Sequence, residues 1–157
     1  MITEEDRSYF KKARLVLVML LASPLIYAGI LVMLHMNKME FGEFGSDTLN
    51  LITIVLSVLG LFSLLQGVMI PRRFIRMAKI RTQTNAGQTI FGAYIIRYAI
   101  FEAISIYGLI LGILGGEIPI IIAFFIVSLI AMIFTFPTED RWASQLTESN
   151  QAENKKY

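Results

Sequence analysis

The chain has 157 residues, of which 55% are apolar and 17% charged, and its mean hydropathy is +0.64. A soluble domain is usually about 45–50% apolar and about 25% charged, so this composition is that of a membrane protein. The absence of cysteine excludes disulfides, thiolate metal sites and thiol nucleophiles. The pI near 9 does not indicate a nucleic-acid partner, because the net charge is only +2 and the basic residues lie where membrane topology places them.

Four apolar stretches are long enough to cross a hydrocarbon core about 30 Å thick, which takes roughly 20 residues of helix. They are Leu15–Leu34, Leu51–Ile70, Ile90–Leu114 and Ile118–Phe136. The first has no small-residue cleavage site and exceeds the length of a signal-peptide core, so we expect it to be retained. The sequence therefore predicts an all-α membrane protein with one four-span domain over residues 1–142.

The first span contains a proline and is preceded by a helix-start signal. Pro24 follows Ser23, whose hydroxyl can bond the carbonyl that the proline leaves without a donor, so we expect a kink and not a break. Residues 3–6 resemble a capping box. The segment that follows is either a plain helical extension of the span or a short amphipathic helix on the inner membrane surface.

The charges of the two long connections set the orientation. The connection over residues 37–48 has one lysine against three acidic residues, whereas residues 71–89 carry five basic residues and no acid. By the positive-inside rule the second connection and the N-terminus are cytoplasmic, and the first connection is external. Four spans then return the C-terminus to the cytoplasm, as expected for a multi-pass protein of the inner membrane.

Small residues recur along one face of the second span and one face of the third. They are Ser57, Gly60, Ser63 and Gly67 in the second span and Gly108, Gly112 and Gly116 in the third. Such spacing lets two helix backbones approach closely, which is how membrane helices commonly associate. We expect these faces to pack spans two and three together, either within one chain or between subunits.

The third and fourth spans are joined by a tight turn. The sequence Gly115-Gly116-Glu117-Ile118-Pro119 has glycine at the end of one helix and proline near the start of the next, so the two spans form an antiparallel pair. Pro137 closes the fourth span, and Trp142 is expected at the membrane interface. Residues 143–157 are polar and are expected to form a mobile cytoplasmic tail.

Only two charged residues, Arg97 and Glu102, lie within the predicted spans. The long stem of Arg97 can reach the inner headgroups, so a membrane anchor is expected there. Glu102 is near the middle of its span and has a short stem, so its carboxyl must be protonated or hydrogen-bonded. Tyr98 and Ser105, at i−4 and i+3, share its face and could bond it. Two hypotheses stay open: a neutral contact between helices, or a carrier of a proton or small cation.

The stretch Glu102-Ala103-Ile104-Ser105-Ile106-Tyr107-Gly108-Leu109-Ile110 resembles the ion-carrying helix of the proteolipid c subunit of rotary ATPases. The small-residue face of the second span and the Pro71-Arg72-Arg73 that follows it are similar to the first helix and loop of that hairpin. The resemblance covers roughly 60 residues and implies that Glu102 carries the ion and that Tyr107 supports its hydrogen bonds. By the same resemblance, Ala103 directly after the acid implies that the ion carried is a proton and not sodium. Spans one and four have no counterpart in a two-helix c subunit.

These observations favour a small membrane subunit and not an enzyme acting on its own. The expected role is an accessory or scaffold component of a larger membrane complex, with lipids and other membrane subunits or copies of itself as partners. The alternative is a proteolipid-like proton-binding subunit, and a weaker alternative is a four-helix transporter or channel. No cofactor or metal site is predicted, since the only histidine, His35, is expected to be a surface residue.

Overall fold

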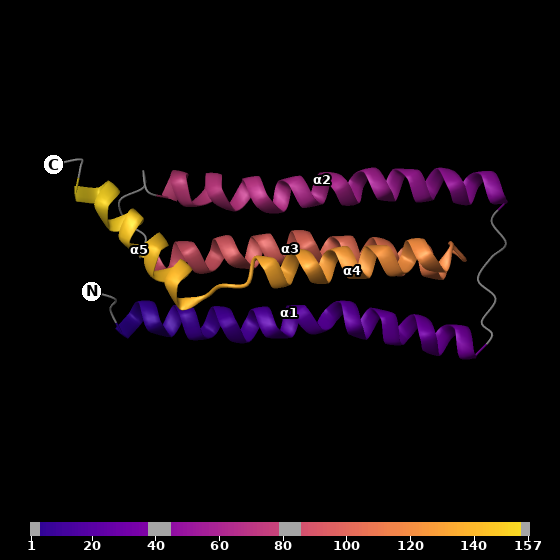
Figure 1. The fold of residues 1–157 in the computed structure, drawn as a ribbon, viewed down its shortest axis with the longest axis horizontal. Coiled ribbons are helices and arrows are strands. Elements are labelled where there is room, and N and C mark those ends of the chain that lie inside the picture. The colour runs from indigo at the N-terminus through magenta and orange to yellow at the C-terminus, as the bar shows by residue number, and fades with distance from the viewer. Residues whose placement is uncertain (1–3, 38–44, 79–85, 155–157) are drawn as a thin grey trace.

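The computed structural model describes residues 4–37, 45–78 and 86–154, and the elements within these ranges are all helices. They are α1 (Glu4–Met36), α2 (Ser46–Ala78), α3 (Ala86–Ile113), α4 (Ile118–Phe134) and α5 (Glu139–Asn154). Figure 1 shows α1 to α4 running side by side along the long axis, with α5 set at an angle across one end.

Three helices, α1, α2 and α3, are long and apolar enough to cross a membrane, and α4 with α5 makes a fourth if this pair, bent by 61°, is counted as one span. The chain is therefore a multi-pass membrane protein with three to four crossing helices. The predicted C-terminal ends of the first, third and fourth spans agree within two residues with Met36, Ile113 and Phe134, whereas α2 continues past the predicted end at Ile70 to Ala78. Helix α1 runs without interruption from Glu4, as expected for a helical extension of the first span.

Helix α3 is the centre of the bundle, because α1, α2 and α4 all pack along it and α1 also touches α4. In Figure 1, α1 and α2 lie on opposite sides of the α3–α4 pair. The buried apolar cluster comes from α1, α3, α4 and α5. Helix α2 is attached differently: among its described side chains, only Gly60, Ser63 and Gly67 are buried.

The small residues of α2 receive large side chains from the neighbouring helices. A Cβ on Gly67 would overlap the ring of Phe101 on α3, and a Cβ on Gly60 would lie 3.0 Å from Cε1 of Phe124 on α4. The expected contact between the small faces of spans two and three is thus wrong in detail, because each of these α2 glycines accommodates an aromatic ring and not another glycine. Ser57 is exposed, at the edge of this contact.

The glycines of α3 face helices other than α2. A Cβ on Gly108 would lie 2.9 Å from Cβ of Phe124 on α4 and 3.3 Å from the carbonyl oxygen of Ile121. Gly112 accommodates Leu31 of α1. Gly108 and Gly112 therefore pack the bundle within one chain.

The turn between α3 and α4 follows the prediction. Gly115 has a φ of +80°, the left-handed conformation that glycine adopts most readily. The amide of Gly116 donates to the carbonyl of Leu111 at 2.8 Å, and the amide of Gly115 donates to Gly112 at 3.4 Å, which is the Schellman pattern of helix ends. Gly116 thus belongs to a helix cap and not to a helix-packing face. Proline follows at the start of α4, so the two helices run antiparallel (Figure 1).

The proline in α1 is accommodated as the sequence predicts. The hydroxyl of Ser23 donates to the carbonyl oxygen of Leu20 at 2.8 Å. That carbonyl is the one whose usual donor, the amide of residue 24, is missing because residue 24 is proline. The helix therefore continues through Pro24 with this carbonyl satisfied.

Helix α5 closes one end of the bundle. Trp142 is only 2% exposed, and its ring lies 5.5 Å from that of Phe10 and 5.9 Å from that of Tyr94, measured between centroids. The prediction of an interfacial anchor at Trp142 is corrected, because the ring is buried among α1, α3 and α5. Leu146 is also buried, so the first part of the segment expected to be mobile is packed against the bundle. Residues 155–157 of that segment lie outside the described residues.

A carboxylate of α1 lies at the start of α3. Asp6 is 9% exposed, and a Cβ on Gly87 would lie 2.7 Å from its Oδ1. The N-terminal turn of a helix favours negative charge, because its first amides have no partner within the helix. This contact therefore fixes the beginning of α1 against the beginning of α3, a pairing that the sequence pattern alone does not indicate.

Candidate functional site

Glu102 lies in the central third of α3 and is half-buried. The phenol of Tyr27, on α1, donates a hydrogen bond to Oε1 of Glu102 at 2.9 Å. The intramembrane carboxyl is thus bonded across a helix interface to a residue 75 positions earlier. Sequence reasoning missed Tyr27. The available signal was that Tyr27 is the only tyrosine in the predicted spans outside the third.

Tyr98 and Ser105, predicted as partners of this carboxyl, bond other groups. The hydroxyl of Tyr98 donates to the carbonyl oxygen of Met132 at 2.6 Å, and that of Ser105 donates to the main-chain oxygen of Glu102 at 2.8 Å. Met132 is in the last turn of α4, where carbonyls lack a helical donor. Tyr98 therefore caps α4, and neither residue binds the side chain of Glu102. Tyr107 is half-buried on α3.

A second bond joins α3 to α4 beside this cap. The hydroxyl of Ser128 donates to the carbonyl oxygen of Phe101 at 2.8 Å, and the serine is fully buried. Hydroxyls that bond main-chain oxygens are common between membrane helices, where an unpaired polar group is costly. These bonds fix the rotation of α3 and hence the direction in which its residue 102 projects.

Arg97 joins α3 to α2. Its Nε donates to the carbonyl oxygen of Gly67 at 3.2 Å, and its guanidinium lies 5.5 Å from the centroid of the Tyr94 ring. In an α-helix the carbonyl of residue 67 accepts from the amide of residue 71, and residue 71 is proline, which has no amide hydrogen. Arg97 therefore satisfies a carbonyl that Pro71 leaves without a donor. Arg97 thus makes a contact between two helices, and its role as a headgroup anchor stays a prediction.

The other described helices leave one side of α3 partly uncovered. Ala99, Ile106 and Ile110 are exposed, and Glu102 and Ala103 are half-buried on the same side. Positions 99, 102, 103, 106 and 110 are spaced three or four residues apart, so they form one stripe along the helix. We call these five residues the outer stripe of α3. It brings a carboxyl and two alanines to an uncovered surface in the middle of a membrane-crossing helix.

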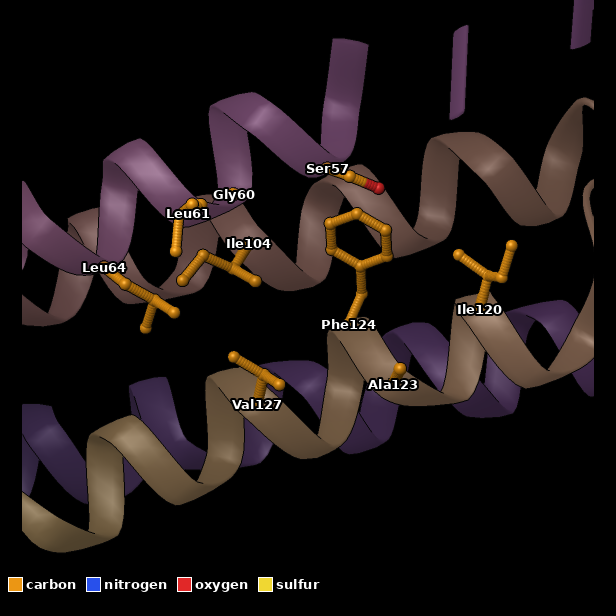
Figure 2. Close-up of a pocket in the computed structure, with 9 residues that line it drawn as sticks. All are labelled: Ser57, Gly60, Leu61, Leu64, Ile104, Ile120, Ala123, Phe124 and Val127. Atoms are coloured by element: carbon orange, nitrogen blue, oxygen red, sulfur yellow. The ribbon is translucent and has the colours of Figure 1, made fainter. Parts of the chain in front are cut away.

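An apolar groove of about 250 Å³ lies between α2 and α4 with α3 as its floor. Figure 2 shows Phe124 of α4 rising toward α2 between Ser57 and Gly60, and Ile104 of α3 beneath. Apart from Ser57, the groove is lined by apolar residues and glycine. The groove therefore offers no carboxylate or base to an ion, and it gives no support to an aqueous path through the bundle.

The described residues contain no group of three or more histidine, cysteine, aspartate or glutamate side chains that could hold a metal. His35 is exposed at the end of α1. The chemistry that the arrangement around Glu102 can carry is limited to binding a proton and donating or accepting hydrogen bonds. Comparisons of the chain with protein-family models, with curated proteins and with solved structures found no match.

Proposed function

We propose that this chain is a non-catalytic subunit of a larger membrane complex, with four spans and both termini on the cytoplasmic side. The fourth span is α4, whose 17 residues give about 26 Å at 1.5 Å per residue. It is short for a core of about 30 Å, but it packs antiparallel along α3 and residues 135–137 extend it. The excess of basic residues in residues 71–89 supports the orientation.

The observation that carries this proposal is that the polar side chains in the spans form hydrogen bonds between helices. Arg97, Tyr98 and Ser128 each donate a hydrogen bond to a main-chain carbonyl of a neighbouring helix, and Glu102 accepts one from Tyr27. These groups hold helices together and form no continuous polar path. Polar side chains that fix helix contacts in this way support the role of an accessory subunit.

The variant E102Q tests this role. Glutamine has the shape of a protonated glutamate and can still accept the bond from Tyr27, so in an assembling subunit this change should leave the activity of the recovered complex intact and alter only assembly or stability. The measurement is co-purification from detergent-solubilised membranes, beside the activity of the complex that is recovered. A variant that assembles normally but loses proton-coupled activity would contradict the accessory role.

A second function, a proteolipid-like proton-binding subunit, is favoured by one observation. Glu102 is half-exposed on the outer stripe of α3 and carries a phenol partner, so its carboxyl can be reached from outside the bundle. The resemblance of residues 102–110 to the ion-carrying helix supports the same function. An intramembrane acid in such a position is frequently part of an ion pathway.

Reaction with a hydrophobic carbodiimide tests the second function. A proton carrier should be modified at Glu102, and mass spectrometry of the α3 peptide locates the adduct. E102Q is the matched control and should not react. Absence of labelling under conditions that modify a known proteolipid would rule out a carrier of this kind.

A further inference from the structure

The carboxyl of Glu102 has one polar partner among the described residues, and that partner is neutral. Tyr27 donates to Oε1. A carboxylate has two oxygens and about four acceptor positions, so a single phenol leaves most of its capacity unused. At bilayer depth an ionised carboxyl without a cation is costly. The described residues supply a hydrogen bond to Glu102 but no countercharge.

The one cation within the spans cannot supply that charge. Arg97 is five residues from Glu102, which places it about 140° around the helix at 3.6 residues per turn. Its guanidinium bonds Gly67 of α2 and lies over the ring of Tyr94. The side of α3 that Arg97 occupies is therefore the α2 side, and Glu102 lies on the side of α1 and the outer stripe.

The outer stripe has the form of a helix-docking surface. Ala99 and Ala103 lie within one turn of Glu102, and small side chains permit the close approach of another helix. Ile106 and Ile110, each 38% exposed, continue the surface with apolar side chains. Gly60, Gly67, Gly108 and Gly112 all receive side chains of other helices of the bundle, whereas the two alanines of the outer stripe lie on a side of α3 that the other described helices leave partly open.

We propose that the outer stripe of α3 docks a transmembrane helix of another membrane protein, and that this helix brings a lysine or arginine to Glu102. The inference rests on the proposed function and names the chemistry of the partner. Charge complementarity is the reason, because the stripe presents an acid at a depth where an opposite charge stabilises both groups. A second copy of this chain does not fit, since Arg97 and Glu102 are the only charged residues in its spans and a two-fold pair would bring the same acid to the same depth.

Designed helices test the proposal directly. Three Leu/Ala transmembrane peptides of about 20 residues, identical except for a central lysine, leucine or glutamate, are reconstituted with the purified chain, and association is measured by energy transfer. The lysine peptide should bind about tenfold more tightly than the leucine peptide, the scale of one polar contact between membrane helices. E102L should abolish the difference between the two peptides.

Two tryptophan variants locate the binding surface. Ile106→Trp places a bulky ring on the outer stripe and should reduce binding of the lysine peptide. Val58→Trp places the same ring on the exposed side of α2 and should leave binding unchanged. Equal binding of the lysine and leucine peptides would overturn the proposal, as would preference for the glutamate peptide, which would indicate two carboxyls sharing a proton.

The failure of this inference is distinguishable from the failure of the proposed function. If E102L stays in a complex of unchanged composition in native membranes, the subunit role stands and the docking surface is elsewhere. If the wild-type chain is found without other proteins, the subunit role itself is wrong, whatever the peptides do.

Discussion

Two main-chain carbonyl oxygens in the spans lack their usual amide donor, because the residue four positions later is proline. Each accepts a hydrogen bond from a side chain instead. For Leu20 the donor is Ser23, a neighbour within the same helix. For Gly67 the donor is Arg97, which belongs to another helix. The first solution keeps α1 intact on its own, whereas the second makes the end of α2 depend on α3.

We predict that R97M destabilises the fold by about 1–3 kcal/mol, the usual worth of a hydrogen bond from a charged donor together with the orphaned acceptor. In a P71A background the amide of residue 71 can bond the Gly67 carbonyl, so the same substitution should cost less. The measurement is a double-mutant cycle on thermal or steric-trap unfolding in micelles. An equal cost of R97M in both backgrounds would show that the Gly67 carbonyl does not need Arg97.

Removal of the Tyr27 hydroxyl tests the carboxyl pair. Y27F should destabilise the fold by about 1 kcal/mol, typical of a side-chain bond between membrane helices, and the effect should vanish in E102L. Y107F is the informative control, because the resemblance to the ion-carrying helix assigns the supporting role to Tyr107. Each tyrosine variant is combined with E102L in a double-mutant cycle. If Y107F and not Y27F shows a coupling energy with E102L, the assignment of Tyr27 as the partner of Glu102 is wrong.

At the scale of the helices, α2 packs extensively along α3 but buries only small residues among its described side chains. Its buried residues are small, and its large side chains are mostly exposed. Gly60 and Gly67 receive aromatic rings, Arg97 bonds the Gly67 carbonyl, and Ile52, Leu56 and Leu64 pack half-buried against the core. Because Gly67 lies against the ring of Phe101, we expect Gly67 to be the position of α2 most sensitive to a larger side chain.

Gly67→Ala should loosen α2 by about 1–3 kcal/mol, because the added methyl overlaps the Phe101 ring in a packed interface. Gly29→Ala on α1 is the matched control, since a Cβ there meets nothing within 4 Å and alanine is the better helix former. Hydrogen exchange of α2 amides, with unfolding measurements, reports the difference. Similar exchange rates and stabilities of the two variants would show that Gly67 and the Phe101 ring are not tightly packed.

The sequence predicts the elements well and their contacts poorly, for a physical reason. Apolar length and glycine or proline at helix ends are local properties, so the helices, the Gly115 turn and the Ser23 bond to Leu20 are all predictable. Which faces meet depends on the rotation of each helix, which a nearly uniform apolar surface does not encode. Small residues were expected to meet small residues, but Gly67 meets Phe101, and the partner of Glu102 lies on α1.

At the scale of the whole molecule, the absence of cysteine makes topology directly measurable. Single cysteines at the exposed positions Glu5, Gly45 and Ser144 can be labelled with a membrane-impermeant maleimide. Four spans with cytoplasmic termini predict labelling of position 45 from outside and of positions 5 and 144 only after the membrane is opened. Labelling of positions 45 and 144 from the same side would mean that α4 does not cross.

The mass of the native particle tests the central claim most directly. The account predicts that the 17.7 kDa chain, released from its native membrane in mild detergent, is found by native mass spectrometry in one or two copies together with other membrane proteins. A chain that is released alone, or as a closed ring of many identical copies, would contradict an accessory subunit that docks its partner at Glu102.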